Sequence, residues 1–350
     1  MKSLKTSMFV CTALLLQPLV LPTLASAQQS DAAVLQSNQN ELLNSDLQQS
    51  AAAARKTLTD ILQQMTRVWR ENSYQLSFVQ ILPSQVNSYQ YQHVFADQRH
   101  YAQLSALDGV QQDIIQRDNI ISYYGGSSYQ PFSIRGDYIL DNIPNVLYAD
   151  YHQLQHYYDF IDAGKSRIAG RIAQVIRVLP KDDFRYQYIL WIDEQSHLLL
   201  RSDMLDRNSE LLEQFRVITL QQTENAQPLV NLIERLNLPP LINIQGERTV
   251  NVDDWQLAWL PPGFKIVKRE QYQTEIGSLH SLMLSDGLFS FSLYINSNIE
   301  ENLGEHYWQQ AGNTIYTETV DNREITLIGQ IPLITAKQIV KDISFKASAK

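Results

Sequence analysis

Two histidines with helical spacing are the first residues in this sequence that suggest chemistry. His152 and His156 lie four positions apart, so a helix would place both imidazoles on one face, with Asp150 or Asp159 nearby. Two imidazoles and a carboxylate can hold zinc, but a pair of histidines without a fixed third ligand is a weak pattern. The surrounding segment is dense in aromatic residues, which bury area while keeping a polar tip. We therefore interpret both histidines as polar members of a packed aromatic segment and predict no metal site.

Recognisable catalytic motifs are missing from the sequence. It contains no G-x-S-x-G, H-E-x-x-H, P-loop or G-x-G-x-x-G pattern. Ser127 follows two glycines without a supporting motif, and the pairs Asp182-Asp183 and Asp253-Asp254 fall in predicted turns, where solvated carboxylates are expected. Acids and bases from distant segments meet only in three dimensions, so a hydrolase remains a third hypothesis. We expect a binding protein without catalytic residues or a cofactor.

The first 27 residues have the pattern of a secretory signal peptide. Lys2 and Lys5 give a basic start, Met8 to Leu21 are apolar, and Ala25-Ser26-Ala27 is a small-residue cleavage site. The one cysteine, Cys11, lies inside this leader, so the mature chain would have neither a disulfide nor a catalytic thiol. These features predict a soluble periplasmic protein.

The charge balance argues against two classes of partner. Loss of Lys2 and Lys5 with the leader would leave 26 basic against 37 acidic side chains, a net charge of −11. Nucleic acids and anionic lipid surfaces attract basic proteins, so neither is expected to bind through overall charge. Residues 28–56 are rich in Gln and Ala and poor in bulky apolar residues, which predicts a flexible segment.

Four strand-like segments, at about 173–179, 185–192, 198–205 and 211–218, organise the chain. Short polar turns separate them, which predicts an up-and-down antiparallel sheet. Within Arg185–Asp193 the residues alternate between faces, yet Ile189 and Trp191 place apolar groups on the charged side as well. Such a sheet packs against something further. A covering helix or second sheet is one interpretation, and a curved half-barrel holding an apolar ligand is the other.

The rest of the predicted N-terminal domain, residues 57–220, surrounds this sheet. A helix starting at Thr57 or Thr59 carries an apolar stripe that ends at Trp69. The aromatic segment Tyr148–Phe160 is expected to form a short helix lying across the open sheet. Further strands are expected at 74–78, 88–95, 114–116, 120–124 and 138–140.

The pattern over residues 221–250 predicts a linker with a short helix after Pro228, and residues 251–350 are predicted to form a smaller C-terminal domain. That domain is expected to have a final helix capped by Thr335. Its strands are expected at 264–270, 279–285, 288–295, 315–320 and 325–331. The predicted fold class is therefore α+β, with a large open antiparallel β half-barrel followed by a smaller α+β domain.

Several long segments together resemble the MucB/RseB family, periplasmic negative regulators of the envelope-stress sigma factor, sigma-E. The resemblance covers nearly all of the chain from about residue 57. Its most specific pieces are residues 157–217, LNLPPL (236–241), WLPPGF (259–264) and LSDGLFSFSLYI (284–295). The Gln-rich segment before residue 55 looks longer than this family usually carries.

The resemblance implies a fold and a role. The large domain should be shaped like the open β-barrel of the lipoprotein carriers LolA and LolB. The protein should bind the periplasmic domain of the membrane anti-sigma factor RseA and shield it from the protease DegS. It should sense lipopolysaccharide or an acylated lipoprotein fragment, and it should form homo-oligomers. The alternative function is a soluble periplasmic carrier of lipid or lipoprotein.

Two sets of aromatic residues are candidates for these contacts, with core packing as the alternative for each. The candidates for a lipid cleft are Tyr151, Phe160, Tyr186 and Trp191. The candidates for partner binding are Trp259, Phe264, Phe289 and Phe291.

Overall fold

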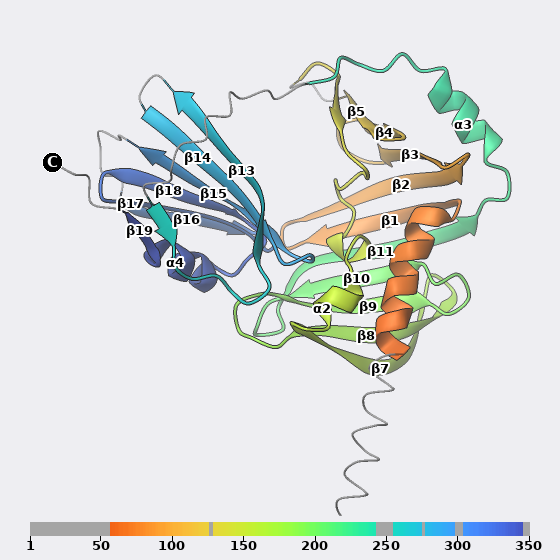
Figure 1. Ribbon diagram of the computed structural model, residues 1–350. Helices are drawn as coiled ribbons and strands as arrows, with labels where there is room; N and C mark the ends of the chain where they lie inside the picture. The colour runs from red at the N-terminus through yellow and green to blue at the C-terminus, as the bar shows by residue number, and fades with distance from the viewer. Residues whose placement is uncertain (1–56, 126–128, 243–254, 275–276, 298–303, 346–350) are drawn as a thin grey trace, which may run out of the picture. The chain divides into compact units, whose positions relative to one another are not determined.

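The computed structural model describes residues 57–125, 129–242, 255–274, 277–297 and 304–345. Two antiparallel sheets dominate it, one of eleven strands and one of six (Figure 1). The strands of the large sheet are β1 (Tyr74–Leu82), β2 (Gln85–Ala96), β3 (Arg99–Ala106), β4 (Gln112–Arg117), β5 (Ile120–Gly125), β6 (Phe132–Arg135), β7 (Tyr158–Ile168), β8 (Arg171–Pro180), β9 (Gln187–Asp193), β10 (Leu199–Leu205) and β11 (Leu211–Gln222).

The large sheet is an open half-barrel built from two meanders. Strands β1 to β6 pair consecutively, as do β7 to β11, and the two series join where β1 pairs antiparallel with β11. Among the described strands β6 and β7 do not pair with each other, so the sheet does not close. The meander predicted across 173–218 is confirmed as β8 to β11, because its polar turns separate segments of the right length.

A helix covers the inner face of this sheet, the face that carries Tyr74. It spans residues 57–71 and is drawn in orange in Figure 1. Its predicted stripe is buried, since Leu62 and Met65 are fully inaccessible and Trp69 is 1% exposed. The indole of Trp69 stacks on Tyr91, with ring centroids 5.5 Å apart. The structure thus shows both the covering helix and the half-barrel, and the apolar ligand of the second interpretation remains a prediction.

The aromatic segment 148–160 differs from its predicted form. Only α2 (Tyr151–Leu154) is helical, capped by the Asp150 carboxylate, which accepts hydrogen bonds from the backbone of His152 and Gln153. The chain then enters β7 at Tyr158, because its alternating residues reach the core on one side. A predicted strand at 138–140 is also wrong, since Tyr138 lies in a bend and residues 139–140 belong to no regular element.

The predicted linker contains the expected helix, α3 (Gln227–Glu234), with Pro228 in its first turn. Its Leu229 and Ile233 pack on Val94 and Tyr101, on the outer face of the large sheet. Part of the linker is therefore attached to the sheet. Residues 243–254, the predicted leader and the segment 28–56 lie outside the described residues, as do Ser127 and Asp253-Asp254. The domain boundaries remain a prediction.

The six-stranded sheet has the order β13-β14-β15-β18-β17-β16. Its strands are β13 (Lys265–Thr274), β14 (Gly277–Ser285), β15 (Ser290–Ser297), β16 (Glu305–Gln310), β17 (Asn313–Val320) and β18 (Arg323–Gly329). Two short strands, β12 (Trp255–Leu257) and β19 (Ile343–Phe345), precede and follow these six strands in the sequence and pair with each other. Helix α4 (Leu333–Lys341) packs against β17 and β18.

One prediction about the second sheet is wrong. Pro332, not Thr335, precedes the first turn of α4. Thr335 lies within α4, and its buried hydroxyl donates a hydrogen bond to the Phe184 carbonyl oxygen 2.9 Å away. The expected α+β class with two sheet-containing parts is confirmed, and residues 54–350 form one compact unit. No helix in the described ranges has the length and apolar character needed to cross a membrane.

A buried histidine in the large sheet predicts an effect of pH on stability. His93 is 4% exposed, and its Nδ1 lies 2.8 Å from the Asn72 carbonyl oxygen, to which it donates. Burial is the main cause that lowers the pKa of His93 from 6.5 to about 4; the hydrogen bond to Asn72 opposes this shift, and the neighbouring His100 contributes to it. The unfolded chain therefore binds this proton more tightly than the folded chain. The stabilisation is complete above about pH 6.5 and is lost as the pH falls toward 4.

We expect the free energy of unfolding to fall between pH 6.5 and pH 4, with a contribution from His93 of at most about 1.4 kcal/mol per pH unit. Urea denaturation at several pH values measures this free energy of unfolding. His93→Gln should flatten this dependence, whereas His152→Gln, at an exposed position, should leave it unchanged. Equal slopes for all three proteins would contradict the assignment.

Candidate functional site

A buried arginine connects the large sheet to the second sheet. The Arg185 side chain is fully inaccessible and donates four hydrogen bonds. Nε and Nη2 bond the Asp182 carboxylate at 3.1 and 2.6 Å, Nη1 bonds Asp286 at 2.6 Å, and Nη2 also bonds the Pro262 carbonyl at 2.6 Å. The guanidinium also lies over the rings of Tyr158 and Phe264, and its Cζ is 5.3 Å from the centre of each ring. One side chain thus holds three separate segments together.

Asp286 is positioned by its own hairpin. It lies in the β14–β15 turn, where its Oδ1 accepts hydrogen bonds from the backbone of Leu288 and Phe289, both at 2.8 Å. Its Oδ2 accepts from the Tyr158 hydroxyl at 2.5 Å and from Arg185. Burial, with the carboxylate of Asp286 adding to it, raises the pKa of Tyr158 well above 10, so its phenol remains a donor. Every oxygen of this buried carboxylate has a partner.

Burial opposes the charged form of Arg185, but the oxygen atoms of Tyr158, Asp286 and Asp182 raise its pKa above the ordinary value for arginine. The guanidinium therefore stays charged. A buried ion pair gains little net stability over apolar packing, because desolvation offsets the attraction. Removing one partner is different, since it leaves the other charge buried and unpaired.

Aromatic packing and backbone hydrogen bonds extend this junction, which we define as the contact around Arg185 and Asp286. Tyr188 stacks on Phe289, with ring centroids 5.5 Å apart. The Tyr186 hydroxyl donates to the Ile331 carbonyl at 3.0 Å. Gly263 has a φ of +92°, and a Cβ there would lie 2.7 Å from the Tyr157 ring, so the WLPPGF turn needs glycine at this position.

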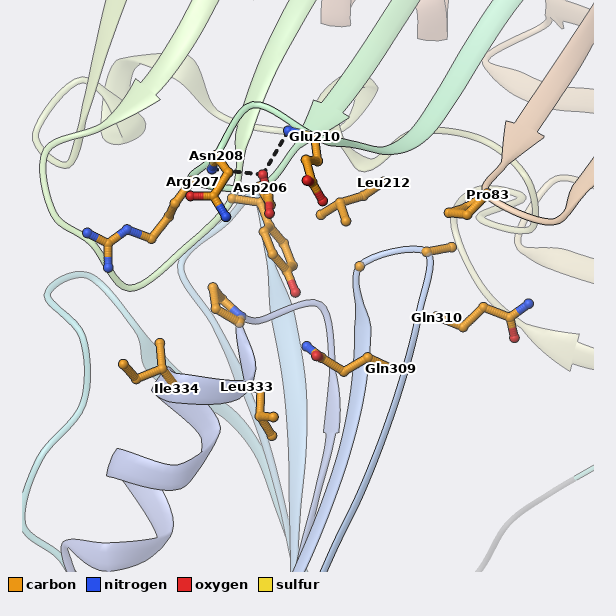
Figure 2. A pocket seen from close by; sticks show the side chains of 14 residues that line it. Pro83, Asp206, Arg207, Asn208, Glu210, Leu212, Gln309, Gln310, Leu333 and Ile334 are labelled. Atoms are coloured by element: carbon orange, nitrogen blue, oxygen red, sulfur yellow. Dashed lines mark hydrogen bonds between the residues drawn. The ribbon is translucent and has the colours of Figure 1, made fainter.

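A pocket of about 490 Å³ opens beside the junction (Figure 2). The β10–β11 turn (206–210) forms one wall, and the β16–β17 turn (309–312) with the start of α4 (332–334) forms the other. Tyr186 lies between them and belongs to both the pocket and the junction. Burial raises the pKa of Tyr186 to about 12. The pocket therefore takes its shape from two walls that the junction holds in place.

The lining of the pocket mixes apolar groups with acids, amides and one arginine, Arg207. Leu212, Leu333 and Ile334 contribute the apolar part, and Ile334 is 64% exposed. Asp206 accepts hydrogen bonds from the backbone of Asn208 and Glu210, both at 2.8 Å, as the dashed lines in Figure 2 show. The arrangement suits a peptide that presents apolar and amide or basic side chains.

The structure separates the four candidates for a lipid cleft. Tyr151 and Phe160 meet edge to face at 5.7 Å and are both buried in the core under helix 57–71. Tyr186 lies at the junction. Trp191 lies on the opposite face of β9, where Arg201 covers its ring at 4.2 Å. Their contact with a lipid remains a prediction.

The four candidates for partner binding all lie at or near the junction. Phe289 packs on Tyr188, and Phe264 packs on Phe291 at 5.3 Å. Trp259 is half-buried and meets Phe184 edge to face at 4.9 Å. In this structure they contact the chain itself, and a role toward a partner remains a prediction.

Sequence reasoning missed the junction. It placed Asp182 in a solvated turn, whereas its carboxylate is 17% exposed and pairs with the buried Arg185. Asp183 fits the expectation, since it is 75% exposed. The available signal was Arg185, a lone charge at the start of an apolar strand. His152 and His156 are exposed, and within the described residues no cluster of three metal-binding side chains occurs.

Comparison with known proteins gives matches over nearly the whole described chain. Residues 57–242 match the model of the MucB/RseB N-terminal domain, and residues 249–344 match that of the MucB/RseB C-terminal domain. The Sigma-E factor regulatory protein RseB of Haemophilus influenzae is 42% identical over 296 residues, covering 85% of this chain and 94% of that protein. The protein of the same name from Escherichia coli K12 is 39% identical over 292 residues, covering 82% and 91%.

Solved structures of MucB also match this chain. The Pseudomonas aeruginosa MucA/MucB complex contains a chain that matches with a TM-score of 0.66 and 26% identity, over 83% of this chain and all of that one. A crystal structure of MucB in complex with MucA(peri) matches with a TM-score of 0.64 and 26% identity, covering 83% and 99%.

The buried carboxylate at the junction gives a test of its energetics. Asp286→Ala leaves Arg185 buried with one partner fewer and removes the cap of the β14–β15 turn. We expect the free energy of unfolding to fall by about 3–5 kcal/mol. Asp183→Ala removes an exposed ion pair with Arg207 and should change it by less than about 1 kcal/mol. Urea denaturation followed by circular dichroism compares them, and equal stability of the two variants would show that the junction does not depend on this pair.

Proposed function

Because the chain belongs to the MucB/RseB family, we propose that it regulates sigma-E in the periplasm by binding the periplasmic region of a membrane anti-sigma factor of the RseA type. The match of both family models, together with the solved complexes of MucB with MucA, carries this proposal. A regulatory binder needs no catalytic residues. The proposed consequence of binding is that the anti-sigma factor is shielded from a DegS-type protease.

The pocket beside the junction is the proposed contact site for the anti-sigma factor. Three observations support it. Its volume of about 490 Å³ accommodates several side chains, it combines exposed apolar groups with acids and amides, and its walls come from both sheet-containing parts. A peptide bound there favours the arrangement in which both walls are in place.

Release of the anti-sigma factor requires a second ligand that prefers another arrangement, since a ligand shifts an equilibrium only by its differential affinity. We propose that lipopolysaccharide or an acylated lipoprotein fragment is this ligand, and that the orientation about 221–250 is the two-state element. The polar part of the junction supports it, because the hydrogen bonds and ion pairs of Arg185 can be exchanged for hydrogen bonds to water. The alternative function, a lipid carrier, is disfavoured because helix 57–71 fills the inner face.

We also propose that copies of the chain self-associate, as the resemblance implies.

Replacement of an exposed pocket residue tests the proposed site. Ile334→Glu places a carboxylate on an apolar wall, where binding would bury it, and should weaken binding of a peptide spanning the periplasmic region of the anti-sigma factor about tenfold, or by about 1.4 kcal/mol. Ile172→Glu is the matched control, because Ile172 is 57% exposed on β8 and outside the pocket lining. Isothermal titration calorimetry measures both.

Two results would count against these proposals in different ways. Equal affinity of Ile334→Glu and wild type would place the contact elsewhere. Absence of peptide binding by the wild-type protein would remove the proposed function itself.

A covalent lock tests the two-state element. A disulfide engineered across the junction should leave binding of the anti-sigma peptide unchanged and should abolish its release by lipopolysaccharide, because the second arrangement becomes inaccessible. The one native cysteine, Cys11, lies in the predicted leader, so no native thiol of the mature chain would compete with the engineered pair. Competition followed by fluorescence anisotropy, with and without reductant, measures release. Normal release from the oxidised protein would contradict the proposal.

A further inference from the structure

A second, smaller pocket of about 180 Å³ lies on the inner face of the large sheet. Tyr188 of β9 pairs with Met204 of β10, which pairs in turn with Glu213 of β11, and all three line the pocket. Paired residues of neighbouring strands present their side chains on the same face. The segment 140–145 and residues of the second sheet-containing part complete the lining, to which helix 57–71 contributes no residue. We call this cavity the Glu213 pocket.

Glu213 is the one acidic residue in this lining, and no basic residue accompanies it. Its side chain is half-buried, and its Oε1 accepts a hydrogen bond from Gln80 Nε2 at 2.8 Å. Within the described residues no lysine, arginine or histidine pairs with this carboxylate. Burial raises the pKa of Glu213, and the hydrogen bond from Gln80 opposes the shift. A carboxylate held away from water without a counter-ion destabilises a fold, so this one calls for an explanation.

Two buried hydroxyl groups belong to the same lining. Tyr188 is 4% exposed and Ser202 is 3% exposed. Neither hydroxyl has a hydrogen-bond partner within the part of the chain that the structure describes. Burial raises the pKa of Tyr188 well above 10, and the charge of Glu213 adds to the shift, so the phenol stays protonated near that carboxylate. Buried hydroxyls are nearly always hydrogen-bonded, and both of these can bond a molecule in the pocket.

Side-chain amides make up the rest of the polar lining. They are Gln80, Asn142, Asn145, Asn313 and Gln330. Two of them bond each other across the pocket, since Asn145 Nδ2 donates to Gln330 Oε1 at 3.1 Å. The Glu213 pocket therefore surrounds one uncompensated negative charge with hydroxyls and amides.

Charge and hydrogen-bonding groups together define the ligand that fits. An anion is repelled by Glu213, and a neutral polar molecule leaves its charge uncompensated. Ca²⁺ takes about 6–8 oxygen ligands, usually with several carboxylates among them, and one carboxylate cannot balance its two charges. A singly charged group with several N–H donors balances the carboxylate and also donates to hydroxyl and amide oxygens. Ammonium and guanidinium groups have this chemistry.

We propose that the Glu213 pocket binds the ammonium or guanidinium group of an organic cation, with Glu213 as its counter-ion and the hydroxyls of Tyr188 and Ser202 as hydrogen-bond acceptors. The same group can come from a free amine or guanidine, or from a lysine or arginine side chain of a polypeptide. The site goes beyond the proposed function, since it shares no lining residue with the pocket proposed for the anti-sigma factor. Tyr188 also stacks on Phe289, so a bound cation contacts a residue of the junction.

Isothermal titration calorimetry with two butyl compounds tests the ligand class. Butylguanidinium is positively charged, and N-butylurea is its neutral counterpart of nearly the same shape. We expect the wild-type chain to bind butylguanidinium at least about tenfold more tightly than N-butylurea, because only the cation compensates the charge of Glu213. Equal affinity for the two compounds, or binding of neither, overturns the proposal. Binding of calcium chloride in place of butylguanidinium overturns the ligand class.

Three variants test the residues. Glu213→Gln removes the charge but keeps the shape and the bond to Gln80, and it should weaken butylguanidinium binding about tenfold or more. Glu224→Gln is the matched control, the same change of charge at an exposed position after β11 and outside the lining, and should bind as the wild type does. Tyr188→Phe keeps the ring that stacks on Phe289 and should weaken binding about threefold, because it removes one acceptor.

Stability gives an independent readout. Since Glu213 has no counter-ion in the free protein, Glu213→Gln should unfold at the same or a higher urea concentration than the wild type while it binds the cation less tightly. A loss of stability in this variant with unchanged affinity for butylguanidinium would assign Glu213 a structural role and overturn the site.

Competition identifies the source of the cation and does not require that the anti-sigma factor binds. Displacement of butylguanidinium by a peptide spanning the periplasmic region of the anti-sigma factor would support a basic side chain of that partner as the occupant. Unchanged affinity for butylguanidinium in the presence of the peptide would support a free amine or guanidine.

Discussion

The ion pair between Arg185 and Asp286 is the contact on which the arrangement of the described chain depends. Aromatic packing around it, such as Tyr188 on Phe289, tolerates sliding, because dispersion and the hydrophobic effect have little directionality. The guanidinium instead fixes the relative position of three segments through four hydrogen bonds of defined geometry. We infer that its main contribution is specificity, since a buried pair adds little net stability over apolar residues of the same volume. The junction thus has one well-defined register, which the hydrogen bonds of Arg185 set.

This balance bears on regulation. Apolar packing alone would not define a pocket, because only directional bonds fix the relative position of its two walls. Here Tyr186 belongs to both the junction and the pocket, so occupancy of the pocket and closure of the junction are linked through one side chain. A partner that contacts both pocket walls binds more tightly when the junction is formed, and it stabilises the formed junction by that difference in binding free energy. A ligand that prefers the separated walls must have a larger difference in binding free energy in order to release the partner.

Local patterns predicted the elements of this fold but not the contacts between them. Alternation in Arg185–Asp193 identified β9, and the stripe ending at Trp69 identified the helix on the inner face, because each pattern follows from neighbouring residues. Strand β16 was missed because its sequence, EHYWQQ, is exposed on both faces and has no apolar alternation. The junction was missed for a different reason: Arg185 and Asp286 are 101 positions apart, and each by itself reads as a turn or surface residue. Without the resemblance to a family, the residues alone indicated a binding protein and no partner.

The filled inner face constrains how the proposed acyl ligand acts. Leu62, Met65 and Trp69 are buried against the large sheet, and exposing three such side chains costs roughly 5–9 kcal/mol at about 1.5–3 kcal/mol each. A state with helix 57–71 displaced would then be populated at about one part in a thousand or less, because each 1.4 kcal/mol is tenfold. A carrier that loads and unloads lipid needs its cleft accessible at a far smaller cost. A sensor, by contrast, benefits from a closed resting state that only a tightly bound apolar ligand can open, since the apolar surface of the ligand replaces that of the helix. The packing of this face is therefore better suited to switching than to transport.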